Sequence, residues 1–131
     1  MANIVFMCMH NAIRSRMAAA FFSKHRTQDR VKAVSAGVTP AAEVPDFVRN
    51  IIQEADVDLS GIKPVKLTAE LAKTVSTIVT LGCGEACPHF PGVDVVDWKL
   101  ADSKDRSLGE AREMRNEIEN KIKVFNAENN Y

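Results

Sequence analysis

Two spacings of apolar positions divide this chain into strands and helices. Short continuous apolar runs, as at residues 4–7, are typical of strands that are covered on both faces. Apolar positions three and four residues apart are instead typical of one face of a helix. The predicted strands span residues 1–7, 31–35, 75–81 and 93–98. The predicted helices follow Ser15, follow Pro45, span residues 68–72 and span residues 108–125.

Each long predicted helix has one apolar face. Ser15 can cap the first helix, which we expect to end within residues 24–27. Pro40 and Pro45 bracket the loop before the second helix, and Thr68 can cap the short third helix. The positions predicted to face the core are Met17, Ala18, Phe21 and Phe22 in the first helix, Phe47, Val48, Ile51, Ile52 and Ala55 in the second, and Ala111, Met114, Ile118, Ile122 and Phe125 in the last.

The order of the elements predicts an α/β fold. Strands that alternate with helices form a parallel sheet with helices on both faces. We therefore expect a single domain, residues 1–131, with a three-layer α/β/α architecture and a four-stranded parallel sheet. In such folds ligands bind beyond the carboxyl ends of the strands. The loops that follow the first, third and fourth strands should open together at that edge.

Charge and cysteine content narrow the classes of partner and compartment. The 17 basic and 17 acidic residues cancel, which gives no support to a nucleic-acid or acidic-membrane partner. No apolar run reaches the length of a membrane span, and no basic leader of a signal peptide is apparent. Three cysteines, an odd number, do not indicate an extracellular disulfide framework. We expect a cytoplasmic monomer.

The first candidate site lies where the first strand meets the first helix. Cys8 ends the strand, and Arg14 and Ser15 stand at the start of the helix. Backbone N–H groups of such a loop and helix N-terminus bind anions and favour a thiolate. Arg14 can hold a tetrahedral oxyanion through two parallel hydrogen bonds, and Ser15 can also donate to Cys8. The loop between them consists of Met9, His10, Asn11, Ala12 and Ile13.

This arrangement makes Cys8 a candidate nucleophile above an oxyanion pocket. The alternative is a buried cysteine at a strand end that has no chemical role. Asn11 can hold the loop in a concave shape or be an ordinary turn residue, and His10 can line the pocket or lie in solvent. We assign Arg16 a structural role.

Two further cysteines lie in the loop after the third strand. Cys83 and Cys87 are four residues apart, and a polar loop with Asp102 follows the fourth strand. The alternatives for these cysteines are a metal pair or two incidental thiols. A zinc ion usually takes four ligands, and only His89 is near them in the sequence, so we expect no metal site.

Together these motifs resemble a known family. Cys8, followed after five residues by Arg14 and Ser15 at the start of an α/β chain, is similar to the low-molecular-weight protein tyrosine phosphatase fold. The resemblance extends over nearly the whole chain. The further stretches resemble the arsenate reductases built on that fold: Ser35-Ala36-Gly37, Asp58-Leu59-Ser60, residues 80–88, Asp97-Trp98 and residues 112–118.

The resemblance to the arsenate reductases implies a thiol relay. Cys8 would attack arsenate, Cys83 would then attack Cys8, and Cys87 would carry the disulfide to the surface. No tightly bound cofactor is implied, because an external thiol reductant, thioredoxin or a small thiol, would supply the electrons.

The resemblance also implies a general acid. Asp102 stands at the matching position, four residues after Trp98. Asp105 is a rival, because the proline and second acid usual in the family are absent here. Ala19 occupies the place where some reductases have an acid that binds potassium, so dependence on that ion is not expected.

Two other functions would use the same first loop. A low-molecular-weight tyrosine phosphatase would hydrolyse phosphomonoesters through a Cys8 thiophosphate, with Arg14 and Asp102 but without a second cysteine. The Asp-Pro-Tyr element expected of it is missing, and the single tyrosine is Tyr131. A sensor would bind arsenate or phosphate without turnover. The second cysteine loop, and not the first loop, separates reduction from hydrolysis.

Overall fold

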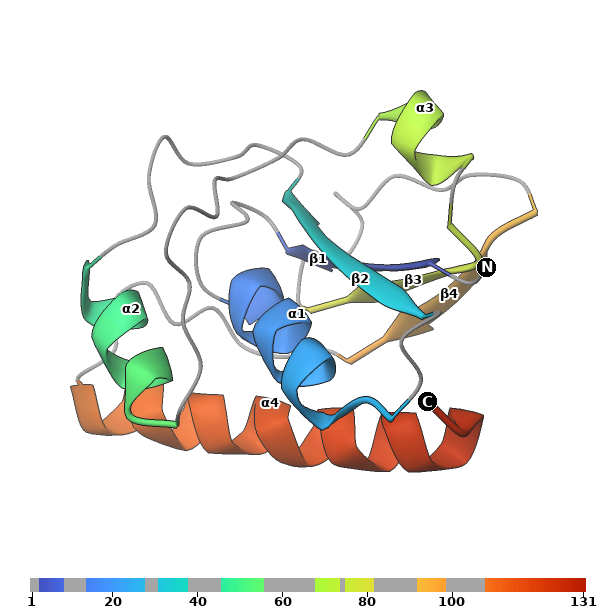
Figure 1. Ribbon diagram of the computed structural model, residues 1–131. Coiled ribbons are helices and arrows are strands. Elements are labelled where there is room, and N and C mark those ends of the chain that lie inside the picture. Colours follow the sequence, from blue (N-terminus) through green and yellow to red (C-terminus); the bar gives the residue numbers. More distant parts are fainter. Residues whose placement is uncertain are drawn as a thin grey trace.

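Four parallel strands and four helices make up the part of the chain that the computed structural model describes, which is residues 3–8, 14–27, 31–37, 46–55, 68–73, 75–81, 92–98 and 108–131 (Figure 1). The strands are β1 (Asn3–Cys8), β2 (Lys32–Gly37), β3 (Thr77–Thr80) and β4 (Asp94–Asp97), in the order β2-β1-β3-β4. The helices are α1 (Arg14–His25), α2 (Asp46–Gln53), α3 (Ala69–Ala72) and α4 (Leu108–Asn129). The predicted four-stranded parallel sheet is therefore confirmed.

Strand β1 is apolar throughout because it lies at the centre of the sheet. Its neighbours β2 and β3 both pair with it in parallel, and residues 4–7 are fully buried. Side chains alternate between the two faces, so that Ile4, Phe6 and Cys8 join one apolar cluster and Val5 and Met7 the other. A shift of one residue would exchange the faces, so the apolar pattern also determines the face on which Cys8 lies.

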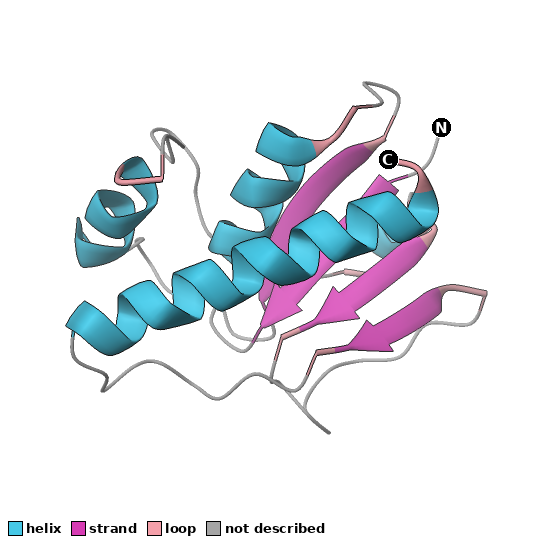
Figure 2. Cartoon of the chain, turned by 90° about the horizontal axis from the view of Figure 1, so that it is seen from below, coloured by secondary structure: helices cyan, strands magenta, loops and turns pink. Residues whose placement is uncertain are grey.

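Helices α1 and α4 cover the face of the sheet that carries Cys8 (Figure 2). Phe6 of β1, Phe22 of α1 and Phe125 of α4 meet there, with ring centroids 5.8 Å (Phe6–Phe22), 6.3 Å (Phe6–Phe125) and 6.5 Å (Phe22–Phe125) apart. Trp98, after β4, lies 6.0 Å from Phe6. Tilted and edge-on aromatic pairs at such distances add stability beyond the area that they bury. This aromatic core holds α1 in place over the sheet.

The opposite face of the sheet has a smaller apolar cluster. Val5, Met7, Ala36, Val75 and Ile78 form it, all of them buried. Helix α3 lies on this side of the sheet, away from α1 and α4 (Figure 1). Helices thus flank both faces, which confirms the layered α/β/α prediction.

The C-terminal helix is longer than the apolar pattern predicts. The pattern ends at Phe125, whereas α4 continues to Asn129. Asn130 then adopts a left-handed conformation with φ 59°, a common way to end a helix. The last residue explains the extension, because the ring of Tyr131 packs 5.8 Å from that of Phe125 and 5.9 Å from that of Phe22. No helix among the described residues is long and apolar enough to cross a membrane.

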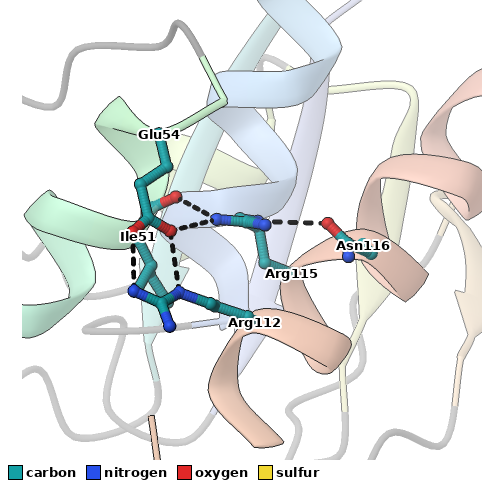
Figure 3. A network of polar contacts seen from close by, with 5 residues as sticks. All are labelled: Ile51, Glu54, Arg112, Arg115 and Asn116. Atoms are coloured by element: carbon teal, nitrogen blue, oxygen red, sulfur yellow. Dashed lines mark hydrogen bonds and ion pairs between the residues drawn. The ribbon is translucent and has the colours of Figure 1, made fainter. Parts of the chain in front are cut away.

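A polar network joins α2 to α4 (Figure 3). The Glu54 carboxylate accepts hydrogen bonds from Nε and Nη2 of Arg112, at 2.9 and 2.7 Å, and from Nη1 of Arg115 at 2.7 Å. Arg115 also donates to the backbone carbonyl of Ile51 at 2.7 Å. The hydrogen bonds from Arg112 and then Arg115 lower the pKa of Glu54. This contact holds the end of α2 against α4 at the surface.

Candidate functional site

The strands end together at the edge of the sheet where the sequence predicts the site. Cys8 is opposite Gly37 of β2, and Met7 is opposite Thr80 of β3. The ladder continues one residue further, since the N–H of Leu81 donates to the carbonyl of Met7 at 2.7 Å. Strand β4 is in the same parallel register beside β3. The chain therefore leaves all four strands at one edge.

Cys8 is buried at this edge and contacts the start of α1. Its Sγ lies 3.1 Å from the Oγ of Ser15, and the two side chains are 2% and 0% exposed, respectively. A thiol at Cys8 donates this hydrogen bond, whereas a thiolate accepts it from the Ser15 hydroxyl. The contact follows from the fold, because β1 directs Cys8 to the face that α1 covers.

The prediction that Ser15 caps the helix is wrong. Helix α1 begins at Arg14, so Ser15 lies within the first turn and not before it. Its hydroxyl is turned toward the sulfur of Cys8, seven residues earlier in the chain. A local capping preference is thus overridden by a contact that only the packing of α1 on β1 creates.

Two buried arginines flank Ser15. Arg14 is 3% exposed and Arg16 is 2% exposed. Burial lowers the pKa of the Arg16 guanidinium to about 10, and the nearby charge of Cys8 raises it in part. Arg16 is therefore still a cation at neutral pH, and it lies within electrostatic reach of the sulfur.

The structural role predicted for Arg16 stays a prediction. Its guanidinium is buried, and the charge of Cys8 acts on its pKa. Helix α1 starts with two arginines around a serine and has no acid in its first turn. Such a turn opposes the usual preference of helix N-termini for acidic side chains.

These groups together favour an anion. The N-terminus of α1 carries the positive end of the helix dipole, and the guanidinium groups of Arg14 and Arg16 add to it. Arginine is well suited to a planar or tetrahedral oxyanion because it offers several fixed N–H donors. A sulfur nucleophile among such groups can attack an oxyanion whose charge the site neutralises.

The other residues predicted for the site lie outside the described part of the chain. Cys8, Arg14 and Ser15 are the predicted site residues that the structure describes. It brings Cys8 into contact with Ser15 and buries Arg14 in the same turn of α1. Among the described residues, no group of three or more His, Cys, Asp or Glu could hold a metal ion. Those outside the description are Met9, His10, Asn11, Ala12, Ile13, Cys83, Cys87, His89, Asp102 and Asp105.

A separate groove lies between β4 and α4. Its volume is about 900 Å³, and Val96, Trp98 and Phe125 contribute apolar walls. Glu113 and Glu117 also line it. No described residue of the predicted site lines this groove, so we do not connect it with the chemistry of Cys8.

Comparison with known proteins matches this chain to a family. The model of the low molecular weight phosphotyrosine protein phosphatase family matches residues 3–129. A putative arsenate reductase of Halobacterium salinarum is 31% identical over 121 residues, which are 89% of this chain and 85% of that protein.

Two solved structures are similar over most of this chain. A thioredoxin-dependent arsenate reductase of Corynebacterium glutamicum has a TM-score of 0.80 and 32% identity over 95% of this chain, which spans 59% of that longer protein. An arsenate reductase from Archaeoglobus fulgidus has a TM-score of 0.78 and 28% identity, over 93% of this chain and 97% of that one. With a cysteine, a serine and an arginine at the end of β1 and the start of α1, and a family match over almost all its length, this chain belongs to the low molecular weight phosphotyrosine protein phosphatase family.

Proposed function

We propose that this protein reduces arsenate to arsenite by thiol chemistry. The observation that carries the proposal is the buried contact of 3.1 Å between Cys8 and Ser15, beside Arg14, in a chain about a third identical to arsenate reductases. Arsenate is a tetrahedral oxyanion, which suits the positive charge at the start of α1. Cys8 acts as the nucleophile, and Arg14, Ser15 and the loop N–H groups of residues 9–13 hold the oxyanion.

In the first step the Cys8 thiolate attacks arsenic. A sulfur–arsenic bond forms, an arsenic–oxygen bond breaks, and the oxygen leaves as water after protonation. Asp102 supplies a proton, with Asp105 as the alternative acid. Arg14 offsets the charge of the oxyanion, and the Ser15 hydroxyl donates to the sulfur before it attacks.

In the second step Cys83 attacks the sulfur of Cys8. A disulfide forms, the sulfur–arsenic bond breaks, and its electron pair stays on arsenic, which leaves as arsenite. Cys87 then attacks Cys83 and releases the Cys8 thiolate. The position of β3 supports this order. Leu81 is hydrogen-bonded to Met7, and the two Cα–Cα steps from Leu81 to Cys83 span at most about 7 Å.

The electrons come from outside the protein. Each turnover converts two thiols into a disulfide, so a dithiol protein such as thioredoxin, or a small thiol, must reduce the pair again. The similarity to a thioredoxin-dependent reductase supports thioredoxin as the reductant. No tightly bound cofactor is needed for this cycle.

Phosphomonoester hydrolysis is the second candidate function. The family match names a phosphatase, and Cys8, Arg14 and Ser15 would serve a thiophosphate intermediate equally well. In that case water, and not Cys83, would attack the intermediate. Cys83 and Cys87 would then be dispensable.

A single-turnover experiment separates the two functions. The reduced protein is mixed with arsenate without any reductant, arsenite is quantified, and the disulfides are mapped by mass spectrometry. We expect one arsenite per protein and a bridge between Cys83 and Cys87. In Cys87→Ser, arsenite should still form and the bridge should be trapped between Cys8 and Cys83. Cys83→Ser should release no arsenite.

The same variants are then assayed with an aryl phosphate. Cys8→Ser should lose both activities, because both need the nucleophile. Aryl phosphate hydrolysis without any arsenite formation, unchanged in Cys83→Ser, would refute the reductase and support the phosphatase. Arsenate binding with neither product would instead support a sensor.

A further inference from the structure

The groove between β4 and α4 is lined by no described residue of the Cys8 site. Its α4 wall runs from Glu113 to Asn129, which is about 24 Å along the helix axis. Its other wall includes Asp94, Val96 and Trp98, which are alternate residues and therefore share one face of the sheet. A volume of about 900 Å³ lies toward the upper end of the range for ligand pockets, so the groove has room for a chain segment.

The groove gathers exposed apolar side chains. Among the described residues, the exposed large apolar side chains are Val95, Val96 and Val124, and the last two line the groove. Val124 is 57% exposed and Val96 is 36% exposed. Trp98 and Phe125 continue this surface toward the aromatic core. Apolar side chains that are exposed together in one groove are typical of an interaction site, whereas singly scattered ones are not.

The charge in the groove is predominantly negative. Its lining has the carboxylates of Asp94, Glu113, Glu117 and Glu128, against the ammonium of Lys121. None of these carboxylates has an ion-pair partner among the described residues. The whole chain has equal numbers of acidic and basic residues, so the acidic excess is local. A partner that covers the groove must bring positive charge, because an unpaired carboxylate loses its hydration when it is covered.

Strand β4 lies at an edge of the sheet to which a further strand can be added. In the described sheet it pairs with β3 alone (Figure 2). The N–H groups of Asp94 and Trp98 donate toward β3, to the carbonyls of Ser76 and Thr80 at 3.3 and 2.8 Å. Because the direction of these groups alternates along a strand, the N–H of Val95 points away from β3. Main-chain groups at such an edge bind an extended segment by β-strand addition.

We propose that the groove between β4 and α4 docks a basic, extended segment of a partner protein, which adds to the edge of β4. On the face of that segment toward α4, apolar side chains contact Val96 and Val124, and Lys or Arg side chains pair with the carboxylates. Seven extended residues span about 23 Å, which matches the length of the α4 wall. This inference does not depend on arsenate reduction, because the groove and the Cys8 site share no described residue.

The test uses the full chain and a fluorescein-labelled peptide of this chemistry, Lys-Thr-Val-Thr-Lys-Thr-Val. In a strand its lysines and valines share one face, and its threonines lie on the other. Fluorescence anisotropy measures the Kd in about 0.15 M salt, where distant charges are screened. We expect the same peptide with glutamate in place of lysine to bind at least about tenfold more weakly.

Two variants of the groove and one matched control locate the bound peptide. Glu117→Lys replaces an attraction by a repulsion, so the Kd should rise about tenfold. Val124→Gln removes apolar contact and should raise the Kd several-fold. Glu70→Lys is the control, because it makes the same charge change on α3, on the other side of the sheet, and should leave the Kd unchanged. All three side chains are exposed, so none of these substitutions should disturb folding.

Hydrogen exchange tests the mode of binding. Addition of the lysine peptide should slow the exchange of the Val95 amide, because that N–H gains a main-chain acceptor. The amides of β2, at the opposite edge of the sheet, should exchange at an unchanged rate.

Several results would overturn the inference. The first is no binding of the lysine peptide, or equal binding of the lysine and glutamate peptides. The second is the same rise in Kd in Glu70→Lys as in Glu117→Lys, which would indicate attraction to the whole surface. Binding without protection of the Val95 amide would exclude strand addition. Self-association that Glu117→Lys abolishes, measured by analytical ultracentrifugation, would assign the groove to a second copy of this chain instead.

Discussion

The two ends of α1 use positive charge in opposite ways. At the C-terminal end, Lys24 and His25 face the negative end of the helix dipole, and both are close to the Glu119 carboxylate. At the N-terminal end, Arg14 and Arg16 are buried at the positive end of the same dipole. The first arrangement stabilises the helix, and the second opposes it.

The contacts at the C-terminal end of α1 hold this helix against its neighbours. His25 Nε2 lies 2.7 Å from Glu119 Oε2, and the Lys24 ammonium lies 3.8 Å from the same oxygen. Lys24 also donates to the carbonyl of Ala55 at 2.6 Å. This end ties α1 to α4 and to the end of α2. The N-terminal end of α1 therefore carries buried positive charge at some expense to stability, as functional sites often do.

The largest effect should come from the aromatic core that holds α1 on the sheet. Phe22 is fully buried between the rings of Phe6, Phe125 and Tyr131. Phe22→Ala should lower the free energy of unfolding by about 3–5 kcal/mol, measured by urea denaturation. Phe22→Leu is the matched control and should cost much less. A loss in Phe22→Ala as small as that in Phe22→Leu would contradict this account of the core.

The next largest effect should come from a substitution at the N-terminal end of α1 alone. Arg14→Lys keeps the charge but removes the planar pair of donors, so kcat/KM for arsenate should fall by about 10²–10³-fold. The free energy of unfolding should change little, because the lysine keeps the positive charge at the start of α1. Steady-state kinetics and urea denaturation measure the two quantities. Wild-type kinetics in this variant would remove Arg14 from the oxyanion site.

A substitution at the C-terminal end of α1 should instead change the stability and leave the kinetics unchanged. Glu119→Gln should leave the kinetics unchanged and lower the free energy of unfolding by about 0.5–1.5 kcal/mol, because it weakens the contacts with His25 and Lys24. A loss of activity without a loss of stability would show that the two ends are not separated as described.

The Glu119 carboxylate also makes the stability of the protein depend on pH. Burial raises the pKa of Glu119, but the hydrogen bond with His25 and the charges of Lys24, His25 and Lys123 outweigh it, so the pKa lies below its ordinary value of 4.5. A carboxyl with a lower pKa in the folded state stabilises the protein above its unfolded-state pKa, and this contribution disappears as the pH falls through the folded-state pKa. The wild type should therefore lose more stability than Glu119→Gln between neutral and acidic pH in urea denaturation.

The smallest effect belongs to the exposed network of Figure 3. Glu54→Gln removes the negative charge that pairs with Arg112 and Arg115, at a surface where water and salt screen the charges. The melting temperature should fall less than in Glu119→Gln, and the difference from wild type should vanish in about 1 M salt. A larger decrease in melting temperature than in Glu119→Gln, or a decrease that persists in salt, would contradict this prediction. It would show that the exposed network contributes more to stability than Glu119 does.

The elements of the fold were accessible from local patterns. The apolar run at residues 4–7 predicts a strand covered on both faces, and apolar positions at helical spacing predict α1 and α4. The end of α4 was predicted four residues too early, because it depends on Tyr131 packing against Phe22 on another helix. The role of Ser15 as a cap was wrong for a similar reason, since a contact with β1 replaced a local preference.

By itself, the sequence determined the period of each element, the order of strands and helices, and the presence of a cysteine, a serine and an arginine around one turn. These follow from side-chain chemistry and nearest neighbours in the chain. Only the tertiary structure decided that Cys8 faces α1, that its sulfur meets Ser15, and that Arg14 and Arg16 are both buried in the first turn of that helix. Burial and electrostatic reach are properties of residues brought together in space, and no local pattern contains them.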